Sequence, residues 1–126
     1  MIRIAPALLA TACIAVAAQA QTQRAFPQDA LRGSLVVGVA PDVVLNGERA
    51  RLAPGARIRT AANMVVVPSA VIGGPYLVHY TVDTSGLVKD VWILRPEEAA
   101  VQPWPKTRAE AAAWRFDPVG QVWTKP

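Results

Sequence analysis

The sequence YLVHYTVDTSGLVKDVWIL, residues 76–94, decides the fold that we expect for this chain. Two runs rich in Val, Ile and aromatic residues, 76–83 and 87–94, flank a three-residue connection, 84–86. Residues of these types favour strands, and Gly86 supplies the left-handed backbone that the last position of such a loop requires. The stretch therefore predicts an antiparallel β-hairpin.

The loop also predicts the register of this hairpin, in which Asp83 pairs with Leu87. Both faces are then largely apolar, which places the hairpin inside a sandwich, in a small barrel, or in a sheet with helices behind it. In this register Tyr80 lies opposite Asp90, so we expect the Asp90 carboxylate to accept a hydrogen bond from the Tyr80 hydroxyl.

Upstream of the hairpin, Val-rich runs alternate with turn-forming residues. Asn46-Gly47 is the dipeptide that best tolerates the two positive φ angles of a type I′ turn, so it predicts a second hairpin. Pro54-Gly55 predicts a further turn. The strands expected here are 34–39, 43–45, 48–52, 56–59 and 64–67.

Downstream of residue 95 the composition favours helices. Glu97-Glu98-Ala99-Ala100 predicts one helical turn with solvated acids at its start. Residues 107–114 predict a second short helix, because Thr107 and Glu110 have capping-box spacing. We therefore predict a mainly β domain of about six strands over 33–126, with one or two short C-terminal helices and an aromatic tail; the alternative is an α+β fold.

The N-terminus predicts export. Arg3 precedes an apolar run, and Ala18-Gln19-Ala20 has the small-x-small pattern that a signal peptidase accepts, so residues 1–20 predict a cleavable signal peptide followed by a polar leader, 21–32. A membrane anchor and a lipoprotein acylated at Cys13 are the alternatives. We expect a periplasmic or secreted protein without a membrane span after processing.

Two segments resemble part of a known family. YTVDTSGLVKDVWIL (80–94) and AAAWRFDP (111–118) are similar to the C-terminal domain of TonB, in which a hairpin with a D-x-x-G turn precedes a helix ending in a W-x-F-x-P element. Pro103 and Pro105 interrupt the longer helix of that pattern, so the resemblance does not imply energy transmission to outer-membrane receptors.

A second, shorter resemblance is to the copper amine oxidase N-terminal-like domains of exported bacterial proteins, carried by VLNGE (44–48) and VVVP (65–68). As a whole, the chain resembles small exported proteins of Gram-negative bacteria. That resemblance implies a compartment and no chemistry.

Few residues offer catalytic chemistry. Cys13, the single cysteine, would be removed with the signal peptide, so we expect no thiol catalysis. Because His79 is the single histidine, we also expect no zinc or copper cluster, and no cofactor. We expect His79 to be a structural strand residue with a backbone or carboxyl partner. The enzyme alternative is a small acid/base hydrolase in which His79 acts with Asp83 or Asp90.

Four arginines form the main charge feature: Arg49, Arg51, Arg57 and Arg59. Each pair is spaced by two, so in a strand each pair projects from one face, and on neighbouring strands the four guanidinium groups would form an anion-binding patch. A solvated edge is the alternative. Without Arg3, 12 basic residues face 9 acidic ones; this +3 charge suits anionic envelope surfaces better than nucleic acid.

The four tryptophans, Trp92, Trp104, Trp114 and Trp123, lie in the last third of the chain. They predict a tail packed on the sheet, with sugar or peptide binding as the alternative. Together these observations predict a non-enzymatic binding or structural module of the cell envelope, with an anionic envelope polymer or another envelope protein as its partner.

Overall fold

The structure, a computed structural model, describes residues 23–126. The predicted signal peptide and Cys13 lie outside these residues. The elements are β1 (Leu31–Val37), β2 (Asp42–Leu45), β3 (Glu48–Arg59), β4 (Val65–Val66), the 3-10 helix η2 (Pro68–Val71), β5 (Gly73–Val82), β6 (Val88–Ile93), α1 (Pro96–Ala99), α2 (Arg108–Ala113), β7 (Arg115–Asp117) and β8 (Val122–Thr124).

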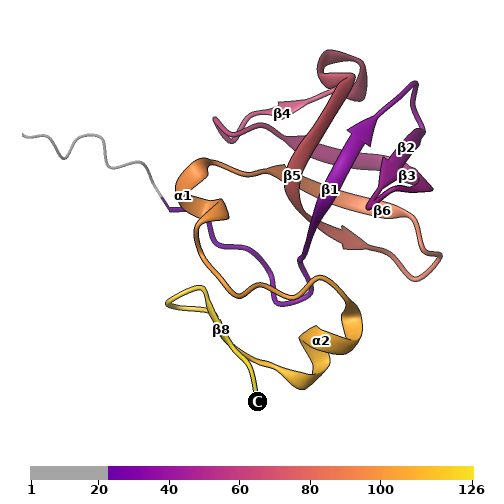
Figure 1. The fold of residues 1–126 in the computed structure, drawn as a ribbon. Coiled ribbons are helices and arrows are strands. Elements are labelled where there is room, and N and C mark those ends of the chain that lie inside the picture. Colours follow the sequence, from indigo (N-terminus) through magenta and orange to yellow (C-terminus); the bar gives the residue numbers. More distant parts are fainter. Residues whose placement is uncertain (1–22) are drawn as a thin grey trace, which may run out of the picture.

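Five of the strands close into a small barrel. β1 pairs with β2 and β5, β5 pairs with β6, and β3 closes the ring through an antiparallel pairing with β2 and a parallel pairing with β6. β4 adds two residues beside β3 (Figure 1). This ring, a three-strand meander closed by a later hairpin, has the Greek-key order of OB-type barrels. The predicted mainly β fold with two short helices is confirmed.

Alternating side chains fill the barrel. Along β1, Leu35 and Val37 are buried while the intervening Val36 is half-buried and Ser34 is exposed. This is the pattern of a strand with one face on a core. The buried interior consists of Leu31, Leu35, Val37, Val43, Leu52, Ile58, Val78, Tyr80, Val88 and Val91.

The β2–β3 hairpin forms as predicted. Asn46 and Gly47 have φ angles of 54° and 82°, the two positive values of a type I′ turn. The Asn46 side chain also accepts a hydrogen bond from Ser34 N at 2.9 Å, which ties the turn to β1.

The prediction of a turn between two strands at Pro54-Gly55 is wrong. β3 runs without interruption from residue 48 to residue 59, and its register against β6 shifts between Leu52 and Arg57. Gly55 has a φ of 79° within this shift. The dipeptide therefore marks an irregular, bulge-like stretch within one long strand, in which β3 advances from Leu52 to Arg57 while β6 advances from Val88 to Asp90. Glycine adopts the positive φ of this stretch at no steric cost.

The β5–β6 hairpin forms with the predicted loop but with a different register. Asp83 N donates to Leu87 O at 2.8 Å, and Val82 lies opposite Val88 as predicted. The next pair is Thr81 with Asp90, because the register shifts by one residue there. Every pair beyond this shift differs from the prediction.

The outer face of β5 and β6 is covered by a second core. Phe26, Ala30, Trp92, Trp104 and Trp123 form it, which confirms that the aromatic tail packs on the sheet. The tail is itself a small hairpin, β7–β8, and Figure 1 shows α1, α2 and β8 together beside the barrel. Thr107 caps α2, as its hydroxyl accepts from Glu110 N at 3.1 Å.

The predicted polar leader, 21–32, belongs in large part to the fold. Arg24, Phe26 and Ala30 are buried, and β1 begins at Leu31, so Arg32 lies inside a strand. The polar composition concealed this role because two of the buried side chains are arginines. Within residues 23–126, no helix has the length and apolar character needed to cross a membrane.

Candidate functional site

All four predicted arginines lie on one strand, β3. Arg49 and Arg51 belong to the arm that pairs with β2, whereas Arg57 and Arg59 follow Gly55 on the arm that pairs with β6. The expected arrangement on two neighbouring strands is therefore wrong. The bulge divides the arginines into two separate pairs.

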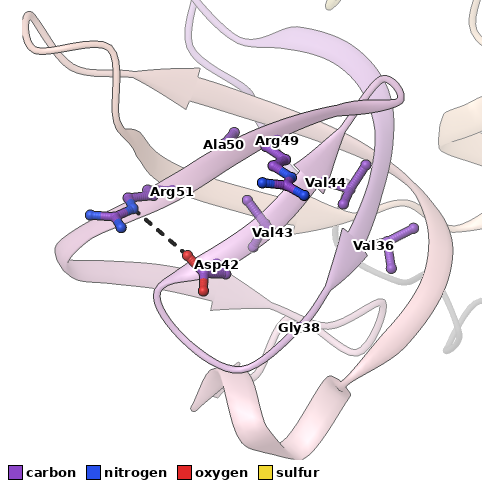
Figure 2. A pocket seen from close by; sticks show the side chains of 8 residues that line it. All are labelled: Val36, Gly38, Asp42, Val43, Val44, Arg49, Ala50 and Arg51. Atoms are coloured by element: carbon purple, nitrogen blue, oxygen red, sulfur yellow. Dashed lines mark ion pairs between the residues drawn. The ribbon is translucent and has the colours of Figure 1, made fainter.

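The first pair lines a surface hollow of about 550 Å³ on β1, β2 and β3. Val36 lies opposite Val44, and Val44 lies opposite Arg49, so these three side chains form a row across the three strands. Figure 2 shows Arg49 beside Val44, and Arg51 farther along β3 next to Asp42. We call the surface lined by Val36, Gly38, Asp42, Val43, Val44, Arg49, Ala50 and Arg51 the β1–β3 hollow.

The two arginines of the hollow differ in their partners. Arg51 Nε lies 3.7 Å from Asp42 Oδ1, and the two side chains are 70% and 71% exposed. An ion pair so open to water contributes little to stability, so Arg51 can exchange Asp42 for a ligand. Arg49 is exposed and has no ion pair or side-chain hydrogen bond with any residue that the structure describes. The hollow therefore has a net charge of +1 and one unengaged guanidinium group.

In the second pair, Arg57 and Arg59, only Arg59 makes contacts that give it a structural role. Arg59 Nη1 donates to Asp90 Oδ1 at 3.4 Å, and its guanidinium lies over the Trp92 ring, 5.2 Å from the centroid. Arg59 is thus held against the outer face of the barrel. Arg57 is exposed and lies outside the hollow.

The predicted hydrogen bond between Tyr80 and Asp90 is absent. Because of the register shift, Asp90 lies on the outer face, where it accepts from Thr81 Oγ1 at 3.3 Å and from Arg59. Tyr80 points into the barrel, where burial raises the pKa of its hydroxyl. The two residues belong to different faces of the hairpin.

His79 is fully buried on the outer face of β5, and its partner differs from the expected one. Arg32 Nε donates to His79 Nε2 at 3.2 Å, so the partner is a guanidinium group and not a carboxylate or the backbone. The imidazole stacks on Trp104 with ring centroids 4.1 Å apart. Burial, and then the positive charges of Arg32 and Arg24, lower the pKa of His79 to about 2. The ring is therefore neutral, and no hydrogen bond joins it to Asp83 or Asp90.

Sequence reasoning missed a buried ionic cluster beside His79. Arg24 donates to both carboxylate oxygens of Glu98, with Nε to Oε2 at 2.8 Å, and also to Thr60 O and Ile93 O. Arg32 donates to the backbone carbonyls of Glu98, Ala99 and Val101. The prediction that Glu98 is solvated is therefore wrong, although exposed Glu97 fits it.

Only one local signal points to this cluster. Arg95 and Glu98 are three residues apart at a helix start, and the Glu98 carboxylate accepts from Arg95 N at 2.9 Å. Burial raises the pKa of Glu98, but the bonds from Arg24 and Arg95 outweigh burial and hold that pKa below its ordinary value. The contact with Arg24 spans 74 positions and leaves no mark in the local sequence.

Within residues 23–126, no three His, Cys, Asp or Glu side chains gather in a way that could hold a metal ion. No protein-family model, curated protein or solved structure matches this chain.

Proposed function

We propose that the protein is an exported, non-enzymatic binding module of the cell envelope, and that it holds an anionic glycan polymer in the β1–β3 hollow. The observation that carries the proposal is the exposed Arg49 guanidinium, which has no partner among the described residues and lies beside Val44 and Arg51. Guanidinium groups bind carboxylates and phosphates through paired, charge-assisted hydrogen bonds.

The shape of the hollow supports a polymer as the ligand. It is an open surface depression on three strands, and its apolar row, Val36 and Val44, supplies a contact surface for sugar ring faces. OB-type barrels present this same surface, around their second and third strands, to oligosaccharides and oligonucleotides. Because one fold can serve many functions, the ligand class is assigned from the charges of Arg49 and Arg51.

The hydrolase alternative has less support. A general acid or base needs a pKa near the working pH and access to substrate. His79 is fully buried, its pKa is lowered to about 2, and its Nε2 is engaged by Arg32.

Export rests on the N-terminal sequence. Cleavage after Ala20 would give a mature chain that begins at Gln21. Intact-mass measurement of the protein recovered from the envelope of the expressing cell tests this part of the proposal. A chain that begins at Cys13 with added acyl mass would contradict it.

Binding to the hollow is tested with lipopolysaccharide and peptidoglycan, with a nucleic acid as control. Arg49→Gln together with Arg51→Gln should weaken glycan binding tenfold or more, because each lost charge-assisted hydrogen bond costs about 1.5 kcal/mol. Arg57→Gln is the matched control, since this residue is exposed on the same strand but outside the hollow. Wild-type affinity should also fall as salt is raised. Equal binding by all three proteins would contradict the proposed site.

A further inference from the structure

A second hollow lies between the outer face of the barrel and the C-terminal segment. It measures about 570 Å³, and no residue lines both this surface and the β1–β3 hollow. We call it the lysine hollow. Its walls include Ser34, Leu77, Lys106, Glu110, Trp114 and Lys125.

The two hollows adjoin along β1 and β2. Side chains two residues apart on a strand project from the same face, and on β1 Ser34 lines the lysine hollow whereas Val36 lines the β1–β3 hollow. In the same way, Asn46, which follows β2, lines the lysine hollow, and Val44 lines the other. Ser34 N donates to Asn46 Oδ1 at 2.9 Å, and Val36 lies opposite Val44. A ligand in the β1–β3 hollow therefore reaches the lysine hollow by one step of about 7 Å along β1.

The lysine hollow has an excess of positive charge. Lys106 and Lys125 are exposed, and neither side chain forms an ion pair or a hydrogen bond with any residue in 23–126. Glu110 is the one acid among the described residues that line the hollow, and its carboxylate accepts from Lys106 N at 2.8 Å. Arg32 also lines the hollow and donates to neutral acceptors alone, which are His79 and three backbone carbonyls. Three basic side chains against one acidic side chain give +2, which favours an anionic ligand.

Apolar surface lies beside these charges. Trp114 is half-buried, and Lys125 Nζ lies 5.4 Å from the centroid of its six-membered or five-membered ring system. Leu77, opposite Ser34 in the β1–β5 register, is 44% exposed. A sugar that carries a phosphate or carboxylate offers the matching chemistry, because its ring face packs on apolar side chains while its charge meets an ammonium group.

We propose that one anionic glycan chain occupies both hollows. The chain leaves the β1–β3 hollow over Ser34, and its charged groups then meet Lys106 and Lys125. One of its sugar rings packs against Trp114 and Leu77. This inference rests on the proposed function, because the β1–β3 hollow holds the first part of the chain. It makes affinity depend on the length of the glycan.

The experiment measures the affinity of the mature chain for deacylated lipopolysaccharide in two lengths, by titration calorimetry. One form has its complete core oligosaccharide, and the other keeps its phosphates but ends after the innermost sugars. We expect the wild type to bind the complete form about fivefold more tightly or better, because the complete form alone reaches the two exposed lysines. The indole N–H signal of Trp114 should shift with the complete form and not with the short one.

A double variant locates the extra affinity. Lys106→Gln with Lys125→Gln should remove the difference between the two forms. Arg57→Gln with Lys89→Gln removes the same amount of charge at exposed positions outside both hollows, and it should retain the difference. All four side chains are exposed, so both variants should fold.

The proposal is overturned if the wild type binds the two forms equally, if the Lys106 and Lys125 variant retains the difference, or if the control variant loses it. Arg49→Gln with Arg51→Gln separates this proposal from the proposed function. If this variant weakens binding but wild-type affinity is independent of length, only the extension into the lysine hollow fails. If this variant binds both forms as the wild type does, or if the wild type binds neither form, the β1–β3 hollow fails as well.

Discussion

Arg32 on β1 donates its Nε–H to His79 Nε2 on β5, and this contact begins a row of side chains on the outside of the barrel. In the sheet register, Arg32 lies opposite His79, His79 opposite Trp92, and Trp92 opposite Arg59. The row thus crosses four neighbouring strands, β1, β5, β6 and β3. The N-terminal and C-terminal segments pack on this row, so the outer face of the sheet forms part of a second core.

Acid should destabilise the protein from neutral pH downward. The pKa of His79 is lowered to about 2 in the folded protein from 6.5, so the unfolded chain binds the extra proton first as the pH falls. His79 therefore does not lower the free energy of unfolding well above pH 6.5. Below that pH it lowers this free energy progressively, by about 2 kcal/mol at pH 5. The charged neighbours Arg24 and Arg32 oppose protonation, and the lowered pKa of Glu98 adds a loss of the same sign below its ordinary range. Urea unfolding at a series of pH values measures this dependence.

His79→Gln is the control for the acid effect, because glutamine does not titrate and its side-chain oxygen can still accept from Arg32. The slope of unfolding free energy between pH 7 and pH 5 should nearly disappear in this variant. An unchanged slope would assign the acid sensitivity to other groups.

Loss of the Glu98 charge should be costly. Glu98→Gln removes the negative partner of buried Arg24, and an unpaired buried charge costs about 3 kcal/mol or more. Glu97→Gln, the same change at the exposed neighbouring position, should alter stability by less than about 0.5 kcal/mol. Equal unfolding free energies for the two variants would show that the Arg24–Glu98 pair does not stabilise the fold.

The fold is predictable from sequence where local chemistry decides it. Asn46-Gly47 and the loop 84–86 specify their hairpins through turn geometry alone, and Thr107 with Glu110 specifies a helix start. Bulges are harder to predict, because Pro54-Gly55 is equally compatible with a turn between strands and with a bend inside one.

The register shift in β5–β6 shows how one such feature changes a site prediction. A single unpaired position, Lys89, separates the predicted partners Tyr80 and Asp90 onto opposite faces of the sheet. The contacts of Arg24 and Arg32 depend on the packing of distant segments, which no local pattern encodes. For the same reason the sequence identified Arg49 and Arg51 as a pair but did not indicate the hollow beside them.

The C-terminal hairpin should contribute strongly to stability. Trp123 is 2% exposed and packs against Trp104 and Phe116, so Trp123→Ala should lower the unfolding free energy by about 3–5 kcal/mol. Val122→Ala, at a 47% exposed position beside it, should cost far less. Deletion of residues 115–126 should lower the melting temperature clearly, and a truncated protein of unchanged stability would show that the tail does not hold the second core.

We expect glycine to be required at position 55 because of the backbone conformation, and not because a side chain would clash with its neighbours. A Cβ at this position would meet no atom within 4 Å, but φ is 79°, so Gly55→Ala should lower the unfolding free energy by about 1 kcal/mol through backbone strain alone. Gly55→Asn should cost less, because asparagine tolerates the left-handed region better than alanine. Equal stability of the alanine variant and the wild type would mean that the bulge relaxes without cost.

The glycan site is tested most directly by mapping backbone amide shifts of the mature chain as deacylated lipopolysaccharide, a soluble phosphorylated oligosaccharide, is added. The account predicts saturable shifts that centre on Val36, Val44, Arg49 and Ala50, and that vanish in the Arg49→Gln/Arg51→Gln protein but persist in Arg57→Gln. Shifts that centre on other strands, or shifts that survive in the double variant, would contradict the assignment of the β1–β3 hollow as the binding site.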